Sequence, residues 1–272
     1  MVSFPNAKIN IGLQVTEKRP DGYHNIQTIF YPIRLHDVLE CLPLSSDQTE
    51  NSFKQTGIPV LGDDTDNLCN RAYQLLKKYF PFIPPVYIHL HKTIPMGAGL
   101  GGGSADGTFM LSMLNDLLEL AISPTQLSAW SLELGSDCPF FLMNKPSYAE
   151  GRGEILTPIE IDLSNYKILL INPGIHVPTG KMFAQLQPNR TAMDLRTAIQ
   201  LPLDEWKSTI KNDFETVVFH LHPECKQIKN QLYESGALYA SMSGSGSTFY
   251  GIYEKSAQPM IDFPERYFYK WV

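Results

Sequence analysis

Residues 95–106 read Pro-Met-Gly-Ala-Gly-Leu-Gly-Gly-Gly-Ser-Ala-Asp, with five glycines within the seven positions from Gly97 to Gly103. Glycine tolerates positive φ and has no Cβ, so consecutive backbone N–H groups can turn inward and approach an anion. A strand-like apolar run leads into this stretch, and a long helix is predicted to begin at Ser104. The unpaired N–H groups and the positive end of a helix attract phosphate. The stretch therefore indicates a phosphate-binding loop.

The two commonest phosphate loops do not match this stretch. A P-loop requires GxxxxGK[ST], and no Lys-Ser or Lys-Thr follows these glycines. A dinucleotide fold requires GxGxxG and an acidic residue about 20 positions later. Gly99-x-Gly101-x-x-Ser104 breaks that pattern, and Glu119 lies inside the apolar helix. The remaining alternative is a flexible linker or a tight turn. The apolar run before the stretch and the helix predicted after it both argue against that alternative.

Composition limits the partners of the protein. The 272 residues allow one large domain or two moderate ones, and 43% hydrophobic with 18% charged residues is typical of a soluble globular protein. A net charge of −6 argues against broad binding to nucleic acid or anionic membranes. No signal peptide and no apolar run of the ~18 residues that span a bilayer are seen. We therefore expect a cytoplasmic protein with no nucleic-acid or membrane partner.

The residues that commonly bind metals are scattered. The cysteines lack CxxC spacing, which predicts neither a disulfide framework nor a zinc site. His220 and His222 have no nearby carboxylate motif and are assigned to structure. No protein ligand for a metal is predicted.

The first half of the chain mixes strands and helices. Residues 7–16 alternate apolar and polar, which predicts a half-buried strand with Lys8 and Asn10 side by side on its polar face. Other strands are predicted over 26–33, 35–42 and 86–91. Helices are predicted over 67–79, from Ser104, and from Pro124 to a C-cap at Gly135.

The second half begins after Gly151-Arg152-Gly153. It predicts a strand over 166–172, helices over 204–220 and 223–235, and strands over 237–242 and 248–253. The last two flank the small-residue loop Ser243-Gly244-Ser245-Gly246-Ser247. No regular βαβ alternation is present, so the fold class is α+β, with a domain boundary near residue 155.

Four further fragments carry a family resemblance. They are Ala7-Lys8-Ile9-Asn10, Arg19-Pro20-Asp21-Gly22-Tyr23-His24, Gln27-Thr28-Ile29-Phe30 and Gly135-Ser136-Asp137-x-Pro139-Phe140-Phe141. With the glycine stretch and the late loop, this ordered set resembles the GHMP small-molecule kinases, and among them the 4-diphosphocytidyl-2-C-methyl-D-erythritol kinases. The resemblance implies two α+β domains, residues 1–155 and a ferredoxin-like 156–272, with the active site in the cleft between them.

The resemblance also implies an activity. It is the ATP-dependent phosphorylation of the 2-hydroxyl of a diphosphocytidyl sugar alcohol in the non-mevalonate isoprenoid pathway, with Mg²⁺ accompanying ATP. The partners would be that small molecule and ATP, and the chain a monomer or homodimer. Two alternatives remain. One is another GHMP kinase, of the homoserine or mevalonate type. The other is a non-catalytic nucleotide-binding relative.

Roles for single residues follow from the resemblance alone. Asp137 resembles the catalytic base and Lys8 its cationic partner. Substrate binding is implied for Asn10, Tyr23, His24, Phe30 and Phe183. ATP binding is implied for Asn67 and Lys92 and for Pro95, Met96, Gly97, Ala98, Gly99, Leu100, Gly101, Gly102, Gly103, Ser104 and Ala105. Ala105 stands where many relatives carry a second serine.

The chemistry of phosphoryl transfer is consistent with these roles. The reaction needs positioning and charge neutralisation, and an alcohol needs a carboxylate that accepts its proton. A nearby lysine keeps that carboxylate ionised. Ordinary alternatives exist: Asp137 as a helix cap or turn residue, Lys8 on the solvated face of an edge strand, and the aromatic residues and His24 as core, rim or loop residues.

Overall fold

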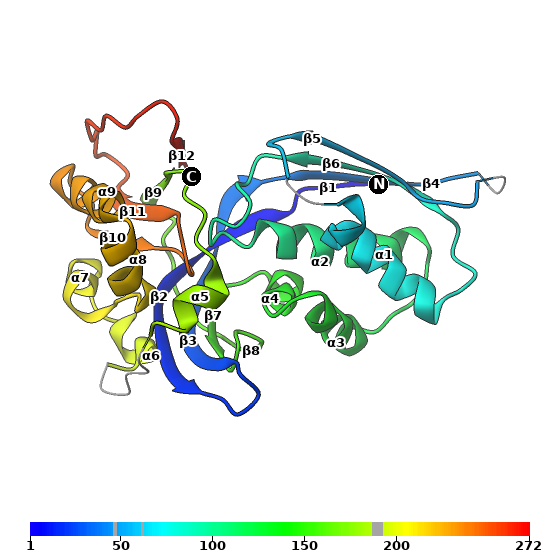
Figure 1. Cartoon of the computed structure of the whole chain (residues 1–272), viewed down its shortest axis with the longest axis horizontal. Helices are drawn as coiled ribbons and strands as arrows, with labels where there is room; N and C mark the ends of the chain where they lie inside the picture. Colours follow the sequence, from blue (N-terminus) through cyan, green and yellow to red (C-terminus); the bar gives the residue numbers. More distant parts are fainter. Residues whose placement is uncertain (46–47, 61–62, 187–192) are drawn as a thin grey trace. The chain divides into compact units, whose positions relative to one another are not determined.

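The computed structural model describes residues 1–45, 48–60, 63–186 and 193–272 (Figure 1). Their contacts form two compact units. The first unit comprises Met1–Ala7, Arg34–Met96 and Gly101–Lys145, and the second comprises Lys8–Ile33, Gly97–Leu100 and Pro146–Val272. Each unit is built from stretches far apart in the sequence. The single boundary near residue 155 stays a prediction.

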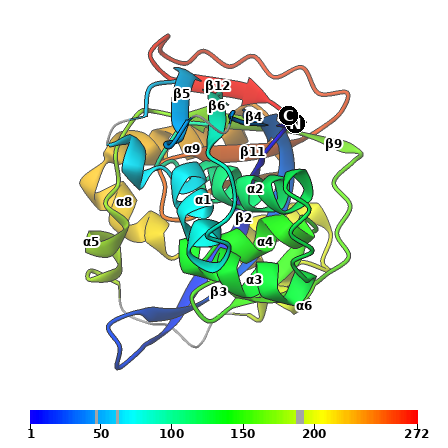
Figure 2. The same ribbon diagram turned by 90° about the vertical axis from the view of Figure 1, so that its right-hand side faces the viewer.

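The first unit packs helices on one face of a mixed sheet. The sheet order is β1-β4-β6-β5, in which β6 runs antiparallel to β4 and parallel to β5. Figure 1 and Figure 2 show the helices together on one side of this sheet. The described elements are β1 (Val2–Ser3), β4 (Val38–Pro43), β5 (Ser52–Gly57), the short 3₁₀ helix η1 (Asp64–Asp66), α1 (Leu68–Tyr79), β6 (Val86–Lys92), α2 (Gly102–Leu117), α3 (Pro124–Leu134) and α4 (Cys138–Met143).

Alternation along β6 explains why one face of that sheet is covered. Val86, Ile88 and Leu90 are fully buried, and they join Leu76 of α1 and Leu114 of α2 in one apolar cluster. Burying such side chains stabilises each by about 1.5–3 kcal/mol. The sheet thereby holds the second half of α2 against its covered face.

The second unit contains two sheets. One has the antiparallel order β10-β11-β9-β12, and the other has the order β2-β3-β7-β8. Helices α8 and α9 contribute to the apolar cluster that also contains Phe249 of β11. The elements are β2 (Asn6–Lys18), β3 (His24–His36), β7 (Ser147–Glu150), β8 (Ile155–Pro158), β9 (Tyr166–Asn172), α5 (Thr179–Phe183), α6 (Leu195–Ala198), the 3₁₀ helix η2 (Leu203–Glu205), α7 (Trp206–Thr209), α8 (Phe214–Leu221), α9 (Pro223–Glu234), β10 (Tyr239–Met242), β11 (Phe249–Glu254) and β12 (Phe268–Trp271).

The predicted helix over 204–220 is wrong, because the chain leaves the helical conformation between α7 and α8. Ile210 is extended, and Leu13 of β2 forms an isolated bridge with Asn212. The Asn212 side chain donates to the carbonyls of Met242 and Gly244 at 2.8 Å each. This segment therefore exchanges helical hydrogen bonds for pairing with two other parts of the second unit.

The predicted half-buried strand is also wrong in its exposure. Both faces of β2 are buried from Asn6 to Val15, including Lys8 (3% exposed) and Asn10 (2% exposed). The alternative that Lys8 lies on a solvated face is therefore excluded. The polar positions are tolerated because their side chains find partners inside the protein.

Other boundaries differ in smaller ways. The predicted strand over 35–42 is divided at Asp37, where β3 has ended and β4 has not begun. Strands β5, β7, β8 and β12 and helices α4, α5 and α6 were not predicted, because each is short or lacks a clear period. In the described part of the chain, no helix is long and apolar enough to cross a bilayer.

Candidate active site

The glycine stretch turns through the left-handed region three times before α2 begins. Gly97, Gly99 and Gly101 have φ of 60°, 78° and 71°. Gly101 is the N-cap of α2, which starts at Gly102, and no side chain caps the first turn. The backbone N–H groups of that turn are therefore the donors available to an anion. A flexible linker does not fit these defined turns.

The late loop, residues 243–247, packs against Gly97–Leu100 within the second unit. The Ser243 hydroxyl donates to the Gly99 carbonyl at 2.7 Å and accepts from the Asn10 N–H at 3.1 Å. The Thr248 N–H donates to the Ala98 carbonyl at 3.2 Å. A Cβ on Gly99 would lie 1.9 Å from the Ser243 carbonyl oxygen, so only glycine fits this approach. The late loop therefore fixes the first half of the glycine stretch.

Lys8 is held by a chain of hydrogen bonds on β2 and β3. Its Nζ donates to Asn10 Oδ1 at 2.6 Å and lies 3.4 Å from the Gly99 carbonyl oxygen. Asn10 Nδ2 donates to Thr28 Oγ1 at 2.9 Å, and that hydroxyl donates to the Gly12 carbonyl. The Thr28 contact fixes which way the Asn10 amide points. The oxygen of Asn10 is thereby presented to the lysine.

Asp137 occupies the N-cap position of α4 in the first unit. Its side chain makes no capping hydrogen bond, so the helix-cap alternative does not account for it. The next residue is anchored, because the Cys138 carbonyl accepts from the Thr108 hydroxyl at 3.0 Å and its N–H donates to the Gly135 carbonyl. The half-buried Asp137 is thus carried by backbone that α2 holds in place.

The aromatic residues and His24, for which substrate binding is implied, lie in three different places. His24 and Phe183 stack with ring centroids 4.8 Å apart and 15° between planes. Phe30 is buried with its ring 4.7 Å from Lys8 Nζ. Tyr23 is 55% exposed, and the Arg152 guanidinium lies 5.0 Å from its ring. Burial, aided by the charge of Lys18, lowers the pKa of His24, so this imidazole is neutral near pH 7.

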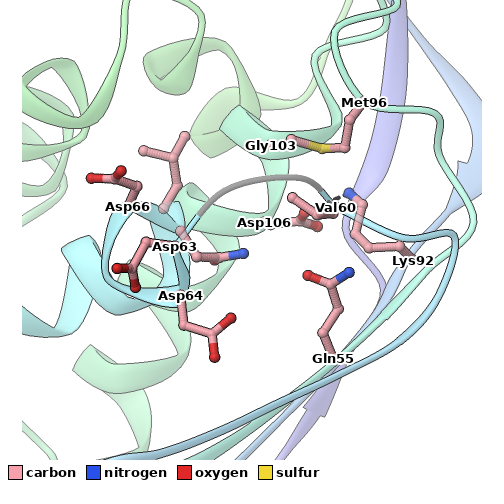
Figure 3. Close-up of a pocket in the computed structure, with 11 residues that line it drawn as sticks. Gln55, Val60, Asp63, Asp64, Asp66, Lys92, Met96, Gly103 and Asp106 are labelled. Carbon is pink, nitrogen blue, oxygen red and sulfur yellow. Dashed lines mark hydrogen bonds and ion pairs between the residues drawn. The ribbon is translucent and has the colours of Figure 1, made fainter.

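A cavity of about 160 Å³ in the first unit brings together four of the residues implied in ATP binding (Figure 3). Those four are Asn67, Lys92, Met96 and Gly103; the other lining residues are Gln55, Val60, Asp63, Asp64, Asp66, Leu68 and Asp106. Asn67 also caps α1, since its Oδ1 accepts from the Cys69 N–H at 2.9 Å. Ala105 is completely buried in α2. In the sequence it lies between Gly103 and Asp106, which both line this cavity.

Lys92 does not offer a free ammonium to this cavity. Its Nζ is ion-paired with Asp37 and with Asp106, the latter at 2.6 Å, and all three side chains are almost completely buried. Burial alone would lower the pKa of Lys92, but the two carboxylates outweigh burial and raise it. No motif or period in the sequence points to Asp37. Asp106 stood in the quoted glycine stretch but was assigned no role.

Family models and relatives agree with this description of the chain. The models of the GHMP kinases N terminal domain and the GHMP kinases C terminal domain match residues 67–145 and 194–270. A 4-diphosphocytidyl-2-C-methyl-D-erythritol kinase of Azobacteroides pseudotrichonymphae is 48% identical over 97% of each chain. One of Bacteroides thetaiotaomicron is 49% identical over 93% of this chain and 92% of its own.

Solved structures give the same result. A crystal structure of 4-(cytidine 5'-diphospho)-2C-methyl-D-erythritol kinase has a TM-score of 0.79 and 32% identity over 93% of this chain and 90% of its own. A mevalonate kinase has a TM-score of 0.70 at 12% identity over 94% and 92%, which shows the fold alone. The predicted α+β, two-domain GHMP kinase fold is confirmed. With near-complete coverage at almost half identity, the chain belongs to the 4-diphosphocytidyl-2-C-methyl-D-erythritol kinases, within the GHMP kinases.

Proposed function

We propose that this kinase transfers the γ-phosphoryl group of ATP to the 2-hydroxyl of 4-diphosphocytidyl-2-C-methyl-D-erythritol, yielding the 2-phosphate and ADP. The observation that carries this proposal is the similarity to kinases of that name along almost the whole chain. The phosphorylated product would serve the non-mevalonate isoprenoid pathway.

Two residues would perform the chemistry. Asp137 would accept the proton of the attacking hydroxyl, because an alcohol becomes a competent nucleophile as a carboxylate takes its proton. The Lys8 ammonium would neutralise charge on the transferring group. The hydrogen bond from Lys8 Nζ to Asn10 Oδ1 at 2.6 Å orients the ammonium, which supports this role.

The phosphates of ATP would lie on residues 95–105, on the turn that precedes α2. The uncapped first turn and the left-handed glycines support this placement. The adenosine end would occupy the cavity lined by Asn67 and Lys92. Three carboxylates that line this cavity, those of Asp63, Asp64 and Asp66, are exposed. They suit ribose hydroxyls and a neutral base better than phosphate.

Mg²⁺ would enter with the nucleotide. This ion keeps several water ligands and is commonly held through substrate phosphates. Among the described residues, no group of three or more His, Cys, Asp or Glu side chains is arranged to hold a metal.

The diphosphocytidyl group would be bound by His24, Phe183, Tyr23, Phe30 and Asn10. The stacked His24–Phe183 pair supports an aromatic site for the cytosine, and a neutral imidazole can both donate and accept a hydrogen bond. The cytoplasmic location and the monomeric or homodimeric state stay predictions.

A substrate panel tests the proposal. ATP consumption is measured with the diphosphocytidyl methylerythritol substrate, with homoserine and with mevalonate. We expect kcat/KM for the first to exceed both others by at least about 10³-fold, because a site built to hold a base rejects substrates without one. Preference for homoserine or mevalonate would favour the other GHMP kinase type. No consumption with any of the three would favour a non-catalytic relative.

A further inference from the structure

The cavity of the first unit contains a buried cluster with unbalanced charge. One ammonium, Lys92 Nζ, contacts two carboxyl groups, and the side chains of Lys92, Asp37 and Asp106 are exposed by 0%, 0% and 3%. If both carboxyls were ionised, the cluster would carry a net negative charge out of water. Such a charge is costly, and a buried group avoids the cost by taking up a proton.

The two carboxyl groups differ in their hydrogen bonds. Asp37 Oδ1 accepts from the N–H groups of Thr93 and Ile94 at 2.6 and 2.9 Å, and its Oδ2 accepts from Lys92. Asp106 Oδ2 accepts from Lys92 at 2.6 Å, and Asp106 Oδ1 has no partner although it is buried. Three donors contact the carboxyl group of Asp37, whereas only one contacts that of Asp106, and donors to a carboxyl group favour its ionised form. The proton therefore belongs on Asp106.

The electrostatics of the surrounding groups point the same way. Burial raises the pKa of Asp106 far above its ordinary value. The charge and hydrogen bond of Lys92 oppose this rise, and the charge of Asp37 and a hydrogen bond between the two carboxyl groups add to it. The thiol of Cys69, on α1, faces the cluster and stays neutral because burial raises its pKa. The remaining acidic groups of the cavity are Asp64 and Asp66 of η1 and its N-cap Asp63, and Figure 3 shows them across the pocket from Lys92.

The position of Asp106 on α2 places this residue where a ligand in the cavity can contact it. Gly103 and Asp106 are three residues apart, so they lie on one face of the helix, and both line the cavity. Gly103 belongs to the uncapped first turn, where phosphate would bind. Asp106, whose Oδ1 has no hydrogen-bond partner, lies about one helical turn further along the same side of the cavity. A ligand with its phosphates at the turn presents its nucleoside to that oxygen.

We propose that Asp106 reads the base of the bound nucleotide, its Oδ1 serving as the hydroxyl of a carboxylic acid that donates a hydrogen bond to a ring nitrogen of adenine. A buried polar atom without a partner is costly, and a ligand that supplies the partner recovers that cost on binding. The inference rests on the proposed nucleotide site and adds a specificity residue to it.

The affinity of the protein for ATP should therefore depend on pH. While Asp106 holds its proton, Oδ1 donates to the base. As pH rises through the raised pKa of Asp106, Oδ1 loses its proton and directs negative charge at the lone pair of the ring nitrogen. Affinity for ATP should then fall by up to about tenfold per pH unit.

Three variants test this inference by calorimetric titration with ATP, adenosine and inorganic tripolyphosphate between about pH 7 and pH 9.5. Asp106→Asn places a neutral N–H donor at the position of Oδ1. Asp106→Leu keeps the approximate shape without a donor. Asp116→Asn makes the same change at an exposed position of the same helix and is the matched control.

The wild-type protein and Asp116→Asn should lose affinity for ATP and adenosine as pH rises. Asp106→Asn should bind both within about twofold of a constant value, and Asp106→Leu should bind both about tenfold more weakly at pH 7. Tripolyphosphate binding should be the same in all four proteins. If Asp106→Leu does not fold, the difference in pH dependence between the wild type and Asp106→Asn decides whether the inference holds.

Two results would overturn the inference: affinity of the wild type that does not change with pH, or ATP binding by Asp106→Leu equal to that of the wild type. If the wild type binds no ATP, the inference and the proposed function both fail. If it shows the expected pH dependence but does not phosphorylate the diphosphocytidyl alcohol, only the proposed function fails.

Discussion

Single residues show how far sequence can specify a site. The roles of Lys8 and Asp137 stay predictions from the family resemblance, and the structure adds what holds each of these residues. The partners of Lys8 include Asn10, the next polar position on β2, and the Gly99 carbonyl, 91 positions away in the sequence. Alternation predicted the first contact. It could not predict the second, which depends on the folding of the glycine stretch.

Asp137→Asn tests the proposed base. The amide keeps the size and most hydrogen bonds of the carboxylate but cannot accept the hydroxyl proton. We expect turnover to fall by about 10²–10⁴-fold with ATP affinity nearly unchanged, as is usual when a general base is lost. The measurement pairs steady-state kinetics with an ATP titration. Unchanged turnover would remove Asp137 from the mechanism.

Asn10→Ala separates two roles for this amide. Asn10 was predicted to contact substrate, and the structure shows its side-chain oxygen on Lys8 and its nitrogen on Thr28. Loss of a hydrogen bond to a charged group costs about 1.5–3 kcal/mol. If Asn10 positions Lys8, kcat should fall about tenfold or more with little change in KM for the alcohol. A raised KM with kcat preserved would instead indicate direct contact with substrate.

At the scale of elements, local signals predicted what local forces determine. The strand over 166–172 matches β9, and the helix predicted over 67–79 matches α1 to within one residue. The break between α7 and α8 could not be seen in the sequence. It arises because Asn212 satisfies carbonyls of Met242 and Gly244, about 30 positions later. The burial of both faces of β2 from Asn6 to Val15 was not predicted, because it also depends on parts of the chain that are distant in sequence.

The contact between the glycine stretch and the late loop can be tested with matched glycines. Gly99 and Gly174 have nearly the same φ, 78° and 75°, but a Cβ meets the Ser243 carbonyl oxygen at the first and nothing within 4 Å at the second. Gly174→Ala should cost about 1 kcal/mol of unfolding free energy through φ strain alone. Gly99→Ala should cost at least about 3 kcal/mol and weaken ATP binding.

Urea denaturation measures both variants of this pair. Equal losses of unfolding free energy in Gly99→Ala and Gly174→Ala would show that the late loop does not constrain Gly99.

At the scale of the whole molecule, the family and fold class were predictable because an ordered set of motifs spans most of the chain. Which segments of the chain make up the second unit could not be predicted. Leu13, Val15 and Ile26 belong to the same apolar cluster as residues of α8, α9 and β11. The Asp213 carboxylate also accepts from the Val15 N–H at 2.8 Å.

A fragment of residues 156–272 tests what this sharing implies. Without β2 and β3 it lacks part of its own apolar cluster and leaves Asp213 without its N–H partner. We expect the fragment to be largely unfolded, since a unit of this size has little stability to lose. Circular dichroism with a thermal scan measures this. A cooperative transition in the fragment would support an independent domain beginning near the predicted boundary.

The identity of the product tests the central claim most directly. Phosphorus NMR follows a mixture of the protein, ATP, Mg²⁺ and 4-diphosphocytidyl-2-C-methyl-D-erythritol. We expect one new phosphomonoester resonance on the erythritol, an intact diphosphate and one ADP for each product molecule. ATP left unconsumed, or phosphate released to water without a new ester, would contradict the account.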